Sequence, residues 1–160
     1  MSHTYSHSSP QYQLQSANLE DAHWIAELRA IVLKEDLTRL ERYDDVRVRQ
    51  RFLNSFQPQY TQLIVVDSQA VGCVALRPAP DAGYVLEHFY IHPDQQGQGI
   101  GGAILAHLLS SHELRGQSVI LNVLQGSPAR RLYERHGFRM YEQDEVDVWM
   151  KRILDASTDG

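Results

Sequence analysis

The feature of this sequence best suited to chemistry is a run of glycines. Residues 97–102 read GQGIGG, and a leucine-rich run of helical character follows at once. Glycine has no Cβ, so successive backbone N–H groups can point outward together, and at a helix N-terminus they meet the positive end of the helix dipole. Four glycines at a helix start therefore favour a phosphate or pyrophosphate ligand over a turn that only packs a helix against a strand.

Two familiar nucleotide sites do not fit the surrounding sequence. The letters match G-x-G-x-x-G, but the strands ahead of the loop form a meander and not a βαβ unit, and the following strand, SVILNVL, carries no carboxylate for a ribose. A P-loop would need a lysine and a serine or threonine after the last glycine, where this chain has Ala103. A nucleotide oxidoreductase is therefore disfavoured.

The hydrophobic pattern predicts the order β α α β β β α β α β β. Asn18 is expected to cap the first helix, Pro58 to end the second, and Ser68 and Gln69 to form a hairpin turn. Ser127 is expected to cap the last helix, which Gly137 ends. The expected strands are 12–15, 61–67, 70–76, 84–92, 118–124, 138–142 and 145–154, and the expected helices begin near 19, 46, 100 and 128, the third ending near 116.

Length and composition indicate one globular domain over residues 11–155, with tails at 1–10 and 156–160. The single cysteine, Cys73, has apolar neighbours and is expected to be buried, with no internal disulfide. The net charge is −5 and the basic residues are scattered, so no nucleic-acid partner is expected. No apolar run approaches the roughly 20 residues of a membrane span, and the N-terminus lacks a secretory pattern. A cytoplasmic protein with no membrane partner is predicted.

Three segments in order resemble the GCN5-related N-acetyltransferase (GNAT) family. Gln96 to Gly101 fits its motif of Gln or Arg, two residues, Gly, one residue, then Gly or Ala. The strand LEHFYIHP before it and SPARRLYERHGF after it are also similar. The resemblance covers nearly the whole chain. It implies an α/β (mixed α+β) fold with a central, mixed, mostly antiparallel twisted sheet of six to seven strands flanked by four helices.

The resemblance implies transfer of an acetyl group from acetyl-CoA directly to a primary amine of a small molecule or peptide. The loop would hold the pyrophosphate, and the strand before it would pair with the pantetheine arm in a slot left by the next strand. Asn122 is a candidate to bind the arm or is an ordinary strand residue, and Ser127 stands where the family often has Asn. The expected acetyl-CoA-binding residues are Phe89, Tyr90, Ile91, Gln96, Gly97, Gln98, Gly99, Ile100, Gly101, Gly102, Asn122 and Ser127.

The family pattern places Tyr133 as the acid that protonates the leaving thiolate, although it could simply pack on the sheet. Glu87 is the candidate base, because an alkyl ammonium titrates near 10.4 and must lose a proton before attack. Its alternative role is an ion pair with an arginine, and His88 is the second candidate base. A backbone N–H within 89–91 is the expected oxyanion donor.

Several expectations concern partners. Glu41, Asp44 and Asp45, between the first two helices, could attract an ammonium group or form a solvated loop. No metal is expected, because His88 and His92 lie about 13 Å apart along a strand. A homodimer is common in the family. The alternative function is a catalytically silent acyl-CoA sensor of the same fold.

Overall fold

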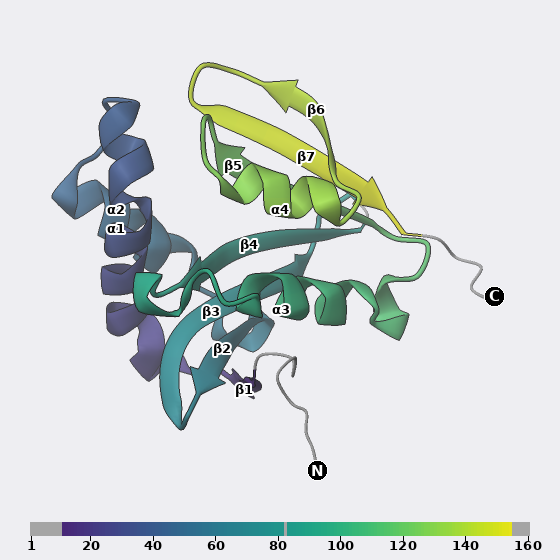
Figure 1. Cartoon of the computed structure of the whole chain (residues 1–160), viewed down its shortest axis with the longest axis horizontal. Coiled ribbons are helices and arrows are strands. Elements are labelled where there is room, and N and C mark those ends of the chain that lie inside the picture. The colour runs from purple at the N-terminus through teal and green to yellow at the C-terminus, as the bar shows by residue number, and fades with distance from the viewer. Residues whose placement is uncertain (1–10, 82, 155–160) are drawn as a thin grey trace, which may run out of the picture.

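A computed structural model describes residues 11–81 and 83–154, so both predicted tails lie outside the described residues. Its centre is one seven-stranded sheet in the order β1-β2-β3-β4-β5-β7-β6, and all neighbouring strands are antiparallel except β4 and β5 (Figure 1). The predicted mixed, mostly antiparallel sheet is confirmed. The strands are β1 Gln13–Ser16, β2 Thr61–Val66, β3 Gln69–Pro78, β4 Tyr84–Ile91, β5 Ser118–Leu124, β6 Arg139–Gln143 and β7 Asp147–Ile153.

Four α-helices occur at the predicted places in the chain. They are α1 Ala22–Arg39, α2 Asp45–Ser55, α3 Ile100–Leu109 and α4 Ala129–Arg135. Asn18 caps a short 3-10 turn that leads into α1: its side chain accepts from Glu20 N at 3.0 Å, and Asp21 accepts from Asn18 N at 2.9 Å. The capping expected from the sequence is confirmed at that turn.

Two helix ends differ from the prediction. Helix α1 continues through residues 37–39, so the connector to α2 is shorter than expected. Arg39 pairs with Asp36 at 2.7 Å in the last turn of the helix. Helix α3 ends at Leu109 and not near Gly116, because a separate 3-10 turn follows and buries Leu114 in the core. Tertiary burial thus overrides the helical pattern there.

The β2–β3 hairpin also turns one residue earlier than expected. Asp67 and Ser68 form the two-residue turn, with φ of 51° and 67°. Positive φ at both central positions is the requirement of a type I′ turn, whose twist matches the flanking strands.

The two faces of the sheet bury different residues because strand side chains alternate. In β2, Ile64 lies in the core with α3 and α4, whereas Leu63 and Val65 pack against α1 and α2. Figure 1 shows α3 and α4 in front of the sheet. Cys73 faces the α1–α2 core, fully buried as predicted, and burial raises the pKa of its thiol to about 12.

The junction between β4 and β5 opens the sheet. Only two residue pairs join these parallel strands, Tyr84 with Val119 and Val85 with Ile120. Beyond Val85 the strands diverge, as Figure 1 shows. Gly83 precedes the junction with φ +80°, and a Cβ there would lie 2.3 Å from Ser118 O, so the chains meet closely at this end. The splaying of these two strands, which the family resemblance implies, is present, and we call the gap between them the slot.

Candidate functional site

The glycine loop joins the end of β4 to the start of α3. Gly97 and Gly99 have φ of 79° and 84°, and Gly99 is the N-cap of the helix. Left-handed backbone of this kind is accessible to glycine at little cost. The Gln96 side chain donates from Nε2 to Ile91 O at 2.8 Å, which ties the loop to the last residue of β4.

The loop presents backbone donors that the described residues leave unpaired. The first helical hydrogen bond of α3 is from Ala103 N to Gly99 O at 3.1 Å, and no described group accepts from the N–H groups of residues 97–102. These donors gather at a helix N-terminus, beside the slot. Such an arrangement suits a phosphate or pyrophosphate.

The other two glycines of the run lie inside α3 and have room for a side-chain methyl group. A Cβ on Gly101 would lie 3.6 Å from both Ile91 and Leu132, and one on Gly102 would lie 3.7 Å from Leu132 and 3.8 Å from His136. These are ordinary contacts between α3, β4 and α4. The run therefore combines two glycines required by backbone conformation with two whose positions would also accept alanine.

This difference predicts opposite effects on stability. We expect Gly99→Ala to lower the free energy of unfolding by about 1–2 kcal/mol, because alanine is strained at φ 84°. Gly101→Ala is the control: it should be neutral or gain up to about 1 kcal/mol, since alanine favours a helix. Urea unfolding of both variants checks this, and equal losses would contradict it.

The residues expected around the pantetheine arm lie on both walls of the slot. Phe89 and Ile91 pack toward the core with α3, whereas Tyr90 belongs to the opposite core with α1 and α2. Asn122 is exposed, pairs with Trp149 of β7, and lies two residues beyond the last β4–β5 pair, where the gap has opened. Its position agrees with a role at the slot, and its contact with a ligand stays a prediction.

Helix α4 begins one residue later than predicted, with Pro128 as its N-cap and not its first residue. The Ser127 Oγ accepts from Ala129 N at 3.1 Å, and Pro128 precedes the first helical residue. Gly137 follows the helix with φ +92°. Ser127 thus fixes the helix that carries Tyr133, while its expected contact with CoA stays a prediction.

Tyr133 lies in the core between α4 and the sheet. It is 7% exposed, and its ring meets Phe138 edge to face with centroids 5.8 Å apart. Burial, and then the nearby Tyr90, raise the pKa of its phenol. Because its pKa is raised, the hydroxyl stays protonated at neutral pH. No described group hydrogen-bonds it, so it is available as a donor.

Glu87, the first candidate base, is paired with an arginine. Its carboxylate receives Arg77 Nε at 2.7 Å and Arg77 Nη2 at 3.4 Å, from the neighbouring strand β3. Both side chains are partly exposed. This is the alternative role expected from the sequence, and it weakens Glu87 as a base because the fork of the guanidinium already holds both oxygens.

His88, the second candidate base, occupies a bulge of β4. The β3–β4 register shifts between Cys73 and Ala75, and His88 has φ +50°. Its ring packs edge to face on Phe52 at 4.9 Å. Burial, the largest effect, together with Arg29 and Arg77, lowers the pKa of His88 despite the opposing effect of Glu87.

This shift gives the stability a pH dependence with a defined sign. Below about pH 6.5 the unfolded chain takes up a proton on His88 that the folded chain resists, so stability present above that pH should fall as the pH drops. The limiting slope is about 1.4 kcal/mol per pH unit. Urea unfolding between pH 7.5 and 5 measures the free energy of unfolding as a function of pH. This curve should be flatter for His88→Asn than for wild type or the surface control His112→Asn; asparagine is chosen because it tolerates positive φ. Parallel curves for all three would contradict it.

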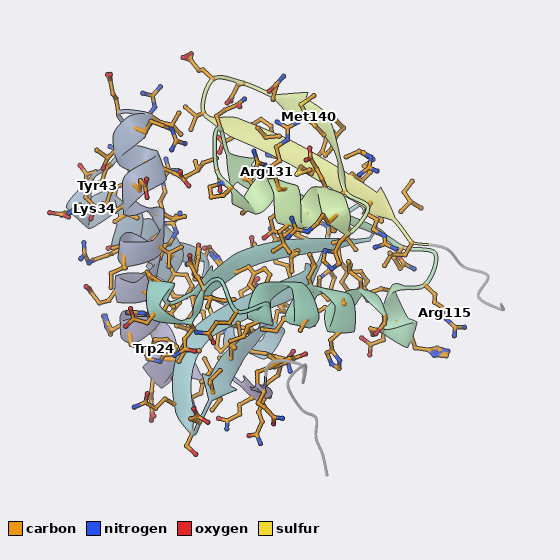
Figure 2. The ribbon with its side chains drawn as sticks, viewed as in Figure 1. Trp24, Lys34, Tyr43, Arg115, Arg131 and Met140 are labelled. Atoms are coloured by element: carbon orange, nitrogen blue, oxygen red, sulfur yellow. The ribbon has the colours of Figure 1, made fainter. Side chains whose placement is uncertain are left out.

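The acidic residues between α1 and α2 are mostly engaged within the fold. Asp44 caps α2 by accepting from Val46 N and Arg47 N at 3.0 and 2.8 Å, and Asp45 accepts from Tyr43 Oη at 2.8 Å. Figure 2 shows Lys34 beside Tyr43, and its ammonium lies 5.4 Å from the ring centroid. These contacts favour the structural alternative over an ammonium site.

Sequence reasoning missed how this connector meets the far half of the sheet. Arg39 at the end of α1 donates to Gln125 O in the β5–α4 loop and packs on Gly126. The Gln125 amide in turn donates to Gln143 Oε1 at 2.9 Å and Asp144 O at 2.8 Å in the β6–β7 hairpin. Helix α1 is therefore linked to the β5–α4 loop and, through Gln125, to the β6–β7 hairpin, by contacts that no sequence pattern marks.

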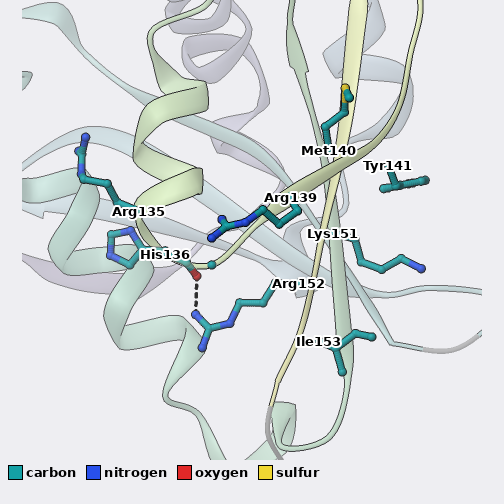
Figure 3. Close-up of a pocket in the computed structure, with 9 residues that line it drawn as sticks. Arg135, His136, Arg139, Met140, Tyr141, Lys151, Arg152 and Ile153 are labelled. Atoms are coloured by element: carbon teal, nitrogen blue, oxygen red, sulfur yellow. Dashed lines mark hydrogen bonds between the residues drawn. The ribbon is translucent and has the colours of Figure 1, made fainter.

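A separate groove of about 690 Å³ lies at the carboxyl end of α4 (Figure 3). Arg139 donates to Glu134 O and Phe138 O, and Arg152 donates to His136 O. These cations satisfy carbonyls at a helix C-terminus, where positive charge is favourable. The groove shares no residue with the glycine loop or Tyr133 and is not part of the candidate site.

Within residues 11–81 and 83–154 there is neither a metal-binding cluster nor a membrane-spanning helix. There, no group of three or more His, Cys, Asp or Glu side chains could hold a metal ion. None of the described helices is both long and apolar enough to cross a bilayer.

Comparison with known proteins supports the same architecture. The PaiA N-acetyltransferase of Thermoplasma acidophilum, solved with coenzyme A, matches over 90% of this chain and 99% of its own, with 16% identity and a TM-score of 0.71. A ribosomal-protein alanine N-acetyltransferase of Escherichia coli matches over 93% and 97%, with 18% identity and a TM-score of 0.70. No curated protein matches the sequence. At these identities the likeness shows the fold.

The family model for the acetyltransferase (GNAT) domain matches residues 59–140, just over half of the chain. The matched stretch runs from the start of β2 to β6 and contains the loop, the slot and Tyr133. With the splayed sheet and the unpaired loop donors, the chain belongs to the GNAT acetyltransferase family.

Proposed function

We propose that this protein is an acetyl-CoA-dependent N-acetyltransferase that transfers the acetyl group directly to a primary amine of a small molecule or peptide. The observation that carries the proposal is the run of unpaired N–H groups at residues 97–102, set at the mouth of the β4–β5 slot. A pyrophosphate on the loop would direct a pantetheine arm into the slot. The relative from Thermoplasma acidophilum, solved with coenzyme A, supports this ligand.

The chemistry needs a neutral amine, a stabilised oxyanion and a protonated leaving thiol. A backbone N–H within 89–91, along the free edge of β4, is the oxyanion donor that we propose. Tyr133 is the acid, since its phenol is protonated, buried and unpaired within the described chain. Asn122 and Ser127 complete the proposed binding of CoA.

The acceptor would approach from the face that carries α1 and α2, because the resemblance to the family implies that the connector between these two helices and the final strands build much of the acceptor site. Membership of the family does not identify the acceptor. The neighbours include an alanine N-acetyltransferase of a ribosomal protein and an N-acetylglutamate synthase, so amine acceptors of different size occur on this fold.

The test is thiol release from acetyl-CoA by the purified protein, with and without polyamines, amino acids, aminoglycosides and N-terminal peptides. Calorimetry measures acetyl-CoA binding in parallel. Amine-dependent release supports the proposal and identifies the acceptor class. Acetyl-CoA binding with no release for any amine would instead favour the silent sensor, and failure to bind acetyl-CoA would contradict both.

A further inference from the structure

A continuous chain of hydrogen bonds connects the buried end of β4 with the surface at the end of α2. Tyr90 Oη lies 3.1 Å from His88 Nδ1, and His88 Nε2 lies 3.0 Å from Ser55 Oγ. Tyr90 is 7% exposed, whereas Ser55 is an exposed residue. The chain of three side chains therefore leads from the protein interior to solvent.

The partners of these groups give the chain one direction. Arg29 Nε donates to Tyr90 Oη at 2.9 Å, so the proton of Tyr90 is directed to His88 Nδ1. A neutral imidazole then carries its proton on Nε2 and donates it to Ser55, whose hydroxyl can donate to Arg51 O at 3.1 Å. The opposite tautomer would leave the buried Tyr90 proton without an acceptor in the described chain, which is costly.

The inner end of the chain lies where an amine proton must leave. Tyr90 belongs to the 89–91 segment that borders the slot, and it faces the α1–α2 side from which the acceptor would approach. Tyr133 belongs to the core on the other face of the sheet, with α3 and α4. The two hydroxyls thus approach the proposed reaction centre from opposite faces of the sheet.

The imidazole is in the correct state to accept a proton. Burial lowers the pKa of His88, so the ring is neutral at pH 7. The charged groups around it are Arg29 of α1, Arg77 of β3 and the adjacent Glu87, and the last two neutralise each other in an ion pair. Burial raises the pKa of Tyr90 to about 12, and Arg29 opposes that shift without reversing it, so Tyr90 passes on its own proton as it receives another and carries no lasting negative charge.

We propose that Tyr90, His88 and Ser55 form the relay that removes the proton of the attacking amine, an inference that rests on the proposed function. The N–H bond of the amine breaks and its proton goes to Tyr90 Oη, whose own proton passes to His88 Nδ1. The Nε2 proton passes to Ser55 Oγ, whose proton goes to water. When the product has left, the relay resets in reverse: water returns a proton through Ser55 Oγ to His88 Nε2, the Nδ1 proton goes back to Tyr90 Oη, and Tyr90 gives up a proton to water in the emptied slot. Glu87, held by Arg77, is not needed as the base.

Tyr90→Phe is the central variant, because it keeps the ring and removes only the hydroxyl. With the amine identified by the panel, we expect kcat at pH 7 to fall about fivefold to tenfold. This loss is smaller than the usual effect of removing a general base, because a water molecule can take the place of the missing hydroxyl. The loss should shrink as the pH approaches the pKa of the amine, since a neutral amine needs no base. A pH-independent loss, or none, would overturn the relay, and calorimetry with acetyl-CoA and a melting curve check that binding and fold persist.

Ser55→Ala tests the outer end, where unfolding is not a concern. Ser110→Ala is the matched control, because Ser110 also ends a helix and donates to a backbone carbonyl, His107 O, at 2.8 Å. We expect a loss of about twofold to fivefold in Ser55→Ala with the pH dependence of Tyr90→Phe, and none in Ser110→Ala. Identical rates for Ser55→Ala and wild type would contradict the exit at Ser55.

The tautomer of His88 tests the relay without relying on turnover. Nitrogen-15 NMR of the imidazole should show the proton on Nε2 in the resting protein. A proton on Nδ1 would overturn the direction of the chain. If wild type transfers acetyl to no amine, the proposed function fails, whereas the NMR result still decides whether the relay is correctly aligned.

Discussion

Tyr133→Phe should lower kcat by about 10-fold or more while the melting temperature stays close to that of wild type. The phenol supplies a proton to the leaving thiolate, and loss of a general acid typically costs at least this much. Its hydroxyl bonds to no described group, so its removal leaves no buried partner unsatisfied. Steady-state kinetics at saturating acetyl-CoA measure the effect.

A packing role for Tyr133 predicts a different outcome. The ring contacts Phe138, and the Tyr133→Phe variant would keep that contact, so Tyr133→Leu is the variant that tests packing. The leucine variant should lose stability as well as activity, by roughly 1–3 kcal/mol. Wild-type kcat in Tyr133→Phe would refute the acid and leave Tyr133 as a core residue.

Gly72→Ala should lower the free energy of unfolding by about 3 kcal/mol, at the upper end of overpacking effects. A Cβ at this position of β3 would lie 2.3 Å from Tyr90 O and 3.1 Å from Ile91 Cα. Both are backbone atoms of the strand that borders the slot, so relief requires β4 to move. Urea unfolding measures the loss.

Gly102→Ala is the control for this prediction. Its Cβ would make only ordinary contacts, at 3.7 and 3.8 Å, with Leu132 and His136. It should be as stable as wild type or slightly more so. Equal stability of Gly72→Ala and Gly102→Ala would show that β3 and β4 do not approach as closely as described.

The sequence predicted most of the fold because its signals are local. Alternating and helical apolar patterns located every strand and helix, and Asn18 and Ser127 marked two capped turns. The turn at Asp67 and Ser68 was missed by one residue, because Asp67 was assigned to the end of the preceding strand and Asp-Ser is not the favoured Asn-Gly or Asp-Gly pair. The length of α3 was overestimated because burial of Leu114 is a tertiary effect.

The candidate site could be predicted only in part. The glycine loop and Tyr133 follow from motifs, but the partner of Glu87 depends on the register between β3 and β4. The contact of His88 with Ser55 joins positions 33 residues apart, and that of Tyr90 with Arg29 joins positions 61 apart. The one local signal was Arg29 itself, a charge four residues after Ile25 on the buried side of α1.

The gap between β4 and β5 has a consequence for self-association. Unpaired strand edges invite pairing with another polypeptide, and proteins generally shield them. Here the unpaired edges of β4 and β5 face each other across a gap that narrows toward Tyr84 and Val85, where the two strands pair. The narrowing end excludes a further strand, so the unpaired backbone groups of β4 and β5 are shielded inside the sheet, whereas its outer edges are β1 and β6.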